Sequence, residues 1–146
     1  NAANQAFVTA ANLGGFWDGD FEIHTGDVLM LNSSAPTIMY SIGNLPATNA
    51  SYNLVSGNNT VMIPLNVNYL AWASEVGDNM TAGGVDQVSY WNNGNQAFVT
   101  AANLGGFWDG DFAVSIAMPL MVNAYAPFTW PSAPPTKSHL NPRASK

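Results

Sequence analysis

The sequence predicts a mainly β protein: an antiparallel, sandwich-like domain with one short helix and an internal repeat. Three observations lead to this fold class. Apolar residues make up 47% of the 146-residue chain, which is enough to bury a core and excludes disorder. Short apolar or alternating runs are separated by turns rich in Gly, Asn and Pro, as in all-β domains. One segment of 18 residues occurs twice in identical form, at 4–21 and at 95–112.

The expected strands follow one another along the chain, and the repeat gives each early strand a later counterpart. Residues 5–10 and 96–101 are short β segments, and residues 16–20 with their copy form an aromatic strand end that enters an Asp-Gly turn. Residues 92–94, Asn-Asn-Gly, form a hairpin turn into the second copy. The remaining expected strands are 27–32, 37–41, 59–65, 85–91, 113–123 and 128–130.

One helix is expected in the middle of the chain. Asn68 is a suitable N-cap, and Gly77 is a suitable terminator. Apolar residues recur between them at helical spacing and fall on one face. These residues are Tyr69, Trp72, Ala73 and Val76.

The repeat extends without gaps from residues 4–41 to residues 95–132, with 24 identities in 38 positions. Identity falls abruptly after the first 18 positions. This edge fits a recent gene conversion, a contact that the molecule makes twice, or a sequence in which one copy was filled in from the other. The predicted organisation is a partial, C-terminal-half repeat at 1–46, a complete repeat unit at 47–132 and a Pro-rich basic tail at 133–146.

The charge pattern excludes several classes of function. Residues 1–136 hold nine carboxylates and no Lys or Arg. Nucleic-acid binding needs cationic contacts to phosphate, so we exclude it. The chain has no cysteine, which excludes disulfides and thiolate catalysis. The longest apolar stretch, 113–126, is interrupted by Pro119 and is too short to span a membrane. A polar surface built from Asn, Ser, Thr and Gly is typical of an extracellular protein.

Several motifs together resemble the tandem β-rich repeats of archaeal and bacterial cell-surface proteins. They are GNNTVMIPLN, a short helix ending in SEVGDN, VDQVSYWNNGNQAFVT, DF-x-(I/V) and an apolar strand ending in APFTW. The resemblance covers residues 52–131, and residues 4–41 for the back half of a unit. The chain departs from the pattern at Met39, where the closing Trp would stand, and at Ala117, where a Gly would stand. The resemblance implies an extracellular scaffold without catalytic residues.

Two pairs of aspartates are the clustered carboxylates of the sequence: Asp18 with Asp20, and Asp109 with Asp111. Each pair flanks a glycine, and its oxygens make it a calcium candidate. The motif lacks the ligand count of a calcium loop, however. We therefore favour an Asp-Gly hairpin turn whose charges face water, and we expect no other cofactor.

Each copy of the repeat carries an adjacent aromatic pair, Phe16 with Trp17 and Phe107 with Trp108. Neighbouring residues of a strand point to opposite faces, so one member of each pair is expected to lie outside the core. We favour a protein–protein contact for the outer member. Stacking on a sugar and burial in the core are the alternatives.

The function favoured by these features is structural. The sequence lacks an identifiable acid, base or nucleophile in a catalytic arrangement, so we do not expect an enzyme. We expect a subunit of a prokaryotic extracellular filament, sheath or surface layer that assembles with copies of itself through β-strand contacts. The alternative is a carbohydrate-binding or adhesive module of a larger secreted protein. Surface glycans are expected at four sequons, whose acceptors are Asn32, Asn49, Asn58 and Asn79.

Overall fold

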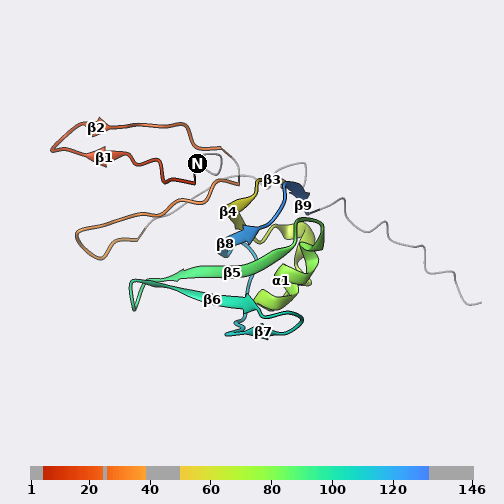
Figure 1. Cartoon of the computed structure of the whole chain (residues 1–146). Helices are drawn as coiled ribbons and strands as arrows, with labels where there is room; N and C mark the ends of the chain where they lie inside the picture. The colour runs from red at the N-terminus through yellow and green to blue at the C-terminus, as the bar shows by residue number, and fades with distance from the viewer. Residues whose placement is uncertain (1–4, 25, 39–49, 132–146) are drawn as a thin grey trace, which may run out of the picture.

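The computed structural model describes residues 5–24, 26–38 and 50–131. Figure 1 shows a compact body that contains most strands and the helix, and an N-terminal segment that extends away from it. In chain order the elements are β1 (Ala11–Asn12), β2 (Trp17–Asp18), β3 (Tyr52–Leu54), β4 (Gly57–Met62), η2 (Leu65–Val67), α1 (Ala73–Asn79), η3 (Thr81–Gly83), β5 (Val85–Asn92), β6 (Ala97–Asn103), β7 (Trp108–Asp109), β8 (Pro119–Ala124) and β9 (Phe128–Trp130).

The main sheet has five antiparallel strands in the order β4-β8-β5-β6-β7. Two smaller antiparallel sheets pair β3 with β9 and β1 with β2. The predicted mainly β, antiparallel fold with one short helix is thus confirmed for the described residues. We call residues 50–92 the front half of the body and residues 95–131 its back half. Because β8 of the back half lies between β4 and β5 of the front half, the sheet joins the two halves.

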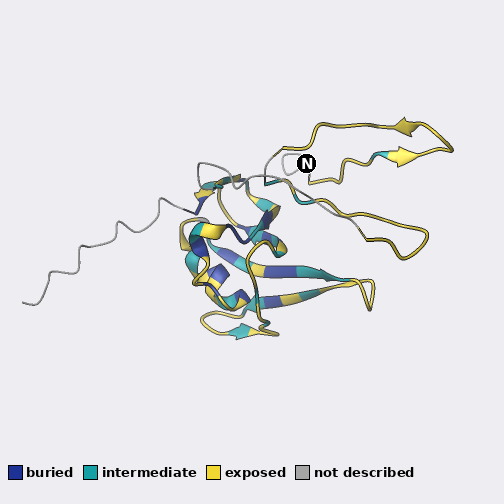
Figure 2. Ribbon diagram, turned by 180° about the vertical axis from the view of Figure 1, so that it is seen from behind, coloured by how far each residue is buried: buried dark blue, intermediate teal, exposed yellow. Residues whose placement is uncertain are grey.

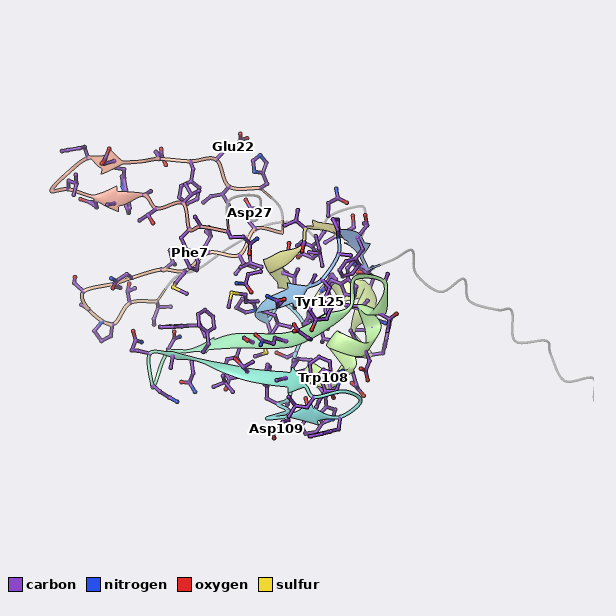
Figure 3. All side chains as sticks on the ribbon, in the orientation of Figure 1. Phe7, Glu22, Asp27, Trp108, Asp109 and Tyr125 are labelled. Atoms are coloured by element: carbon purple, nitrogen blue, oxygen red, sulfur yellow. The ribbon has the colours of Figure 1, made fainter. Side chains whose placement is uncertain are left out.

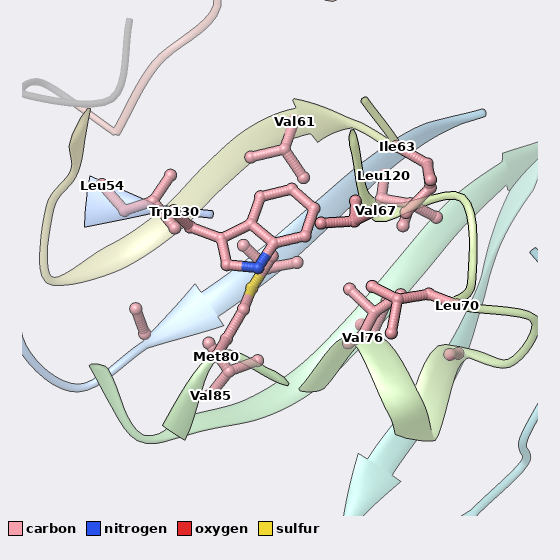
Figure 4. Packing of buried hydrophobic residues seen from close by; sticks show 14 of the residues in the cluster. Leu54, Val61, Ile63, Val67, Leu70, Val76, Met80, Val85, Leu120 and Trp130 are labelled. Carbon is pink, nitrogen blue, oxygen red and sulfur yellow. The ribbon is translucent and has the colours of Figure 1, made fainter. Parts of the chain in front are cut away.

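The core lies between the main sheet and α1, which packs against β5 and β6. Inward residues alternate along β8, where Leu120, Val122 and Ala124 are buried, as expected of a strand with one face in the core. Figure 4 shows Trp130 packed among aliphatic side chains from both halves, with Met80 beneath it. Figure 2 shows the buried residues gathered in the body, while the N-terminal segment is almost entirely exposed.

The helix begins later than the sequence predicted. Asn68 ends η2 instead of capping α1, and Gly77 lies inside the helix instead of ending it. Residues just before α1 are extended because Trp72 forms an isolated β-bridge with Ala113 of the back half. A long-range pairing therefore decides where the helix starts.

The predicted apolar face of the helix is only half correct. Ala73 and Val76 are buried in the core. Tyr69 and Trp72 precede the helix and are about half exposed. Their spacing fits a helical face, but the β-bridge takes this part of the chain out of the helix.

Several predicted strands are confirmed with small shifts of their ends. Those expected at 59–65, 85–91, 96–101 and 128–130 are β4, β5, β6 and β9. The expected hairpin turn is also confirmed. In it, the Asn92 Oδ1 accepts hydrogen bonds from the backbone N–H groups of Gly94 at 2.8 Å and Asn95 at 3.3 Å.

Other predicted strands do not form. Residues 5–10 and 27–32 have no strand structure, although 6–10 are identical in sequence to part of β6. The two copies differ in their neighbouring strands. β5 supplies hydrogen bonds to β6, whereas β5 does not pair with residues 5–10. Of the strand expected at 113–123, only the part from Pro119 onward forms, as β8. Residues 39–49, with the predicted boundary after residue 46, and the tail at 133–146 lie outside the described residues.

Candidate interaction surface

The described residues between 5 and 38, which we call the N-terminal arm, carry large apolar side chains that the body does not cover. None of them belongs to the hydrophobic core or to the residues packed against it. An exposed apolar surface of this extent is typical of an interaction site. The exposed residues are Phe7, Val8, Leu13, Phe16, Trp17, Phe21, Ile23, Leu29, Met30, Leu31 and Ile38.

Specific contacts join the arm to the body at the outer edge of β4. The Gln5 side-chain amide donates to the Asn58 backbone carbonyl at 3.0 Å, and its Oε1 accepts from the Asn58 N–H at 2.6 Å. Gly26 lies against the ring of Tyr52, whose hydroxyl accepts a hydrogen bond from the Met62 N–H at 3.3 Å. Side chains thus occupy backbone groups of β4 that an additional strand would need.

Two hairpin tips have the same local geometry. Asn12 Oδ1 accepts hydrogen bonds from the N–H groups of Gly14 and Gly15, at 3.0 and 3.2 Å. In the second copy Asn103 Oδ1 accepts from Gly105 and Gly106, each at 3.0 Å. All four glycines have positive φ, the conformation that this turn requires. The 18-residue sequence therefore determines the tip in either environment.

Each hairpin tip presents one leucine and one phenylalanine to solvent. Phe16 and Phe107 are both 60% exposed, and Leu13 and Leu104 are exposed to nearly the same extent as each other. The tip of the β1–β2 hairpin and the tip between β6 and β7 lie on opposite sides of the molecule in Figures 1 and 2. The chain therefore presents the same small apolar surface twice, in two directions.

The two tryptophans of the repeat differ in environment. Trp108 is half-buried against α1, where a Cβ on Gly77 would lie 2.2 Å from its ring atoms. Its Nε1 donates a hydrogen bond to Asp78 Oδ1 at 2.9 Å. Trp17 has no helix beside it and is 62% exposed. In the second copy the inner member of the aromatic pair is thus Trp108, shown in Figure 3, and the outer member is Phe107.

The first aspartate of each pair ends a short strand, Asp18 in β2 and Asp109 in β7, and the second aspartate follows that strand. Neither pair forms the hairpin turn. The glycine between them makes a close backbone approach instead: a Cβ on Gly19 would lie 2.6 Å from the Thr9 carbonyl oxygen, and one on Gly110 would lie 2.7 Å from that of Thr100. Among the described residues, no group of three or more His, Asp or Glu side chains is placed to hold a metal.

Asp111 binds the start of α1. Its Oδ1 accepts from the Ser74 N–H at 2.9 Å, and its Oδ2 accepts from the Ser74 hydroxyl at 2.7 Å. The Glu75 carboxylate accepts hydrogen bonds from the N–H groups of Ala71 and Trp72. Both carboxylates satisfy backbone donors where the helix dipole favours negative charge.

We expect Asp111→Ala to lower the free energy of unfolding by about 1–2 kcal/mol, because α1 loses this capping contact. The matched variant is Asp20→Ala, at the corresponding position of the other copy. In the described structure, Asp20 Oδ1 accepts only a local hydrogen bond from the Phe21 N–H. That change is expected to stay within about 0.5 kcal/mol. Urea unfolding, monitored by tryptophan fluorescence, measures the free energy of unfolding of both variants. Equal losses would contradict the capping role of Asp111.

Two tyrosines have altered acidity. Burial raises the pKa of the Tyr52 hydroxyl; the hydrogen bond from the Met62 N–H lowers this pKa, and the Asp27 charge raises it. At the surface, a hydrogen bond to Asp86 at 2.8 Å raises the pKa of Tyr125. Both hydroxyls therefore hold their protons more tightly than free tyrosine does, which makes neither of them a base near neutral pH.

The sequons lie in different environments. Asn32 and Asn58 are exposed, so a glycan at either has access to solvent. The Asn79 amide donates to the Tyr69 hydroxyl at 3.3 Å and accepts from Trp130 Nε1 at 2.9 Å. A glycan on Asn79 would disturb a contact that holds the core tryptophan. Asn49 lies outside the described residues.

Comparison with family models, curated proteins and solved structures finds no match to the chain. In the described part of the chain, no helix is long and apolar enough to cross a membrane. The sequence did not predict which residues of α1 contact Trp108 and Asp111 of the second copy. These residues are Ser74, Gly77 and Asp78. A glycine at position 77 predicts a helix end from the sequence, whereas in the structure it makes room inside α1 for the Trp108 ring.

Proposed function

We propose that the chain is a structural subunit of a prokaryotic extracellular filament, sheath or surface layer, and that it assembles with copies of itself. The observation that carries this proposal is the pair of identical hairpin tips on opposite sides of the molecule. A self-complementary surface gives a closed dimer when a subunit presents it once. A subunit that presents it twice has two partners and forms open chains.

Three further features support an extracellular scaffold. The body holds no Lys or Arg, and its polar surface depends on Asn, Ser, Thr and Gly. The sequons at Asn32 and Asn58 are exposed. The sequence also resembles β-rich repeats of cell-surface proteins. Aromatic side chains anchor protein interfaces, so Phe16 and Phe107 are the residues that we assign to the contact, with β-strand pairing along the hairpins.

The valence of the subunit tests the proposal. The wild-type chain is expected to form polymers, visible by negative-stain microscopy. Phe16→Asp and Phe107→Asp each place a charge on the apolar surface of one hairpin tip. Each single variant keeps one intact tip, so light scattering is expected to show dimers and no larger polymers. The double variant is expected to be monomeric. Ile116→Asp, at an exposed position outside the tips, is the matched control and is expected to polymerise normally.

Two results would overturn the proposal. One is a wild-type chain that stays monomeric at high concentration, which together with binding on a glycan array would favour the adhesive module instead. The other is a single variant that polymerises as well as the wild type.

A further inference from the structure

We propose that the N-terminal arm binds a second polypeptide segment with the chemistry of the front half, residues 50–92. The arm would complete a second five-stranded sheet with that strand–helix–strand segment. This inference goes beyond the proposed function and uses a different surface from the hairpin tips. It rests on a comparison within the molecule, because the back half shows what covers the corresponding face.

The side chains that carry this inference are buried by the front half in the body, and their counterparts in the arm are exposed. Val122 of β8 is fully buried between β4 and β5, whereas its counterpart Leu31 is 65% exposed. Leu120 is likewise buried, and its counterpart Leu29 is half-exposed. These two positions face the core from β8, an interior strand of the main sheet. The arm therefore exposes the apolar residues whose counterparts in the body face the core from a strand with a neighbour on each side.

The polar contacts repeat the same pattern. In the body, Trp108 sits over Gly77 and donates to Asp78, and Asp111 accepts from Ser74. The arm holds the same two residue types as Trp17 and Asp20 in the same 18-residue sequence. A complementary segment thus needs a glycine under the indole, an acceptor for the indole N–H and donors for the carboxylate. Residues 74–78 supply all three.

The β1–β2 hairpin of the arm already has the conformation of the docked copy. Its hairpin has the same turn hydrogen bonds and the same pattern of positive-φ glycines as the docked copy. In both copies the carboxylate of the last aspartate accepts a hydrogen bond at 3.0 Å from the following phenylalanine N–H. Binding therefore requires little rearrangement of the β1–β2 hairpin, which lowers its entropic cost.

The front half of an intact copy is a poor partner because its own back half already fills it. Residues 1–146 contain one front half and two back-half sequences, so exchange of front halves between copies of these residues would bury no additional apolar surface. The back half also brings Trp130 into the core, whereas the residue at the equivalent position of the first copy is Met39. The partner must therefore bring a front half that lacks its own back half.

A synthetic polypeptide with the sequence of residues 50–92 is the probe. It is added to the complete chain, both in wild-type form and as the Phe16→Asp/Phe107→Asp variant, which separates this binding from polymer formation. Calorimetry and native mass spectrometry are expected to show one probe bound per chain. Hydrogen exchange is expected to slow at least about 10-fold in residues 5–38, where strand pairing protects the amides.

Matched variants identify the surface that binds. Leu31→Asp is expected to weaken probe binding at least about 100-fold, because it places an unpaired charge in the new core. Leu13→Asp makes the same change at a tip residue whose counterpart Leu104 stays exposed in the docked copy, and it is expected to leave binding unchanged. A probe carrying Gly77→Ala is expected to bind poorly, since its methyl group would meet the Trp17 ring.

The inference is overturned if the probe does not bind. It is also overturned if the probe binds Leu31→Asp as well as the wild type, since the probe would then have exchanged with the front half of the body. Protection that appears in residues 96–131 instead of the arm would lead to the same conclusion. A monomeric wild-type chain that binds the probe through the arm would refute the proposed polymer and leave this inference intact.

Discussion

Replacing Trp130 with alanine is expected to lower the free energy of unfolding by about 3–5 kcal/mol, the range for deleting a large aromatic side chain from a packed core. The indole is buried among residues from both halves (Figure 4). Its Nε1 donates a hydrogen bond to Asn79 Oδ1 at 2.9 Å, and its ring stacks with Tyr52 at a centroid distance of 6.2 Å. The variant loses this packing and leaves the Asn79 carbonyl without its partner.

The control for this experiment is the same substitution at Trp17. That side chain is mostly exposed and contributes nothing to the core, so Trp17→Ala is expected to change stability by no more than about 0.5 kcal/mol. Equilibrium urea unfolding followed by far-ultraviolet circular dichroism measures both variants without depending on either indole. Similar losses for the two would mean that the arm is part of the cooperative unit.

Gly77→Ala is expected to destabilise the chain by about 1–3 kcal/mol, the usual cost of overpacking a core. Helix propensity alone would give the opposite sign, since alanine inside a helix is favoured over glycine by about 1 kcal/mol. The new methyl group would lie 2.2 Å from two atoms of the Trp108 ring. The ring has to move, and its hydrogen bond to Asp78 is lost with it.

A double-mutant cycle separates the two effects. A Trp108→Ala background lacks the indole ring that the new methyl group would meet. In this background Gly77→Ala is expected to be neutral or to stabilise the chain by up to about 1 kcal/mol. Thermal and urea unfolding of the four proteins give the coupling energy between the positions. If Gly77→Ala destabilises both backgrounds equally, the contact between the glycine and the indole is not the reason for the glycine.

The candidate site was predicted only in part. The sequence predicted that one member of each aromatic pair would lie outside the core. In the second copy Phe107 is exposed while Trp108 packs against α1, but in the first copy both Phe16 and Trp17 are exposed. It placed the aspartates in hairpin turns, but the turns are formed by the leucine, two glycines and phenylalanine before them. The binding of Asp111 to Ser74 spans 37 positions of the chain, and no local pattern encodes such a contact.

The repeated segment separates what the sequence determines alone from what the tertiary structure decides. The hairpin tip is the same in both copies because its stabilising groups, Asn12 and two glycines or their counterparts, lie within four residues of one another. Strand structure differs: residues 97–103 form β6, whereas the identical stretch of the arm is a strand only at Ala11–Asn12. A strand takes its hydrogen bonds from a neighbour, and β5 is present beside one copy alone. Composition and the alternation of apolar and polar residues thus determined that the chain forms antiparallel strands. The presence of a neighbouring strand with free hydrogen-bonding groups decided which segments became strands.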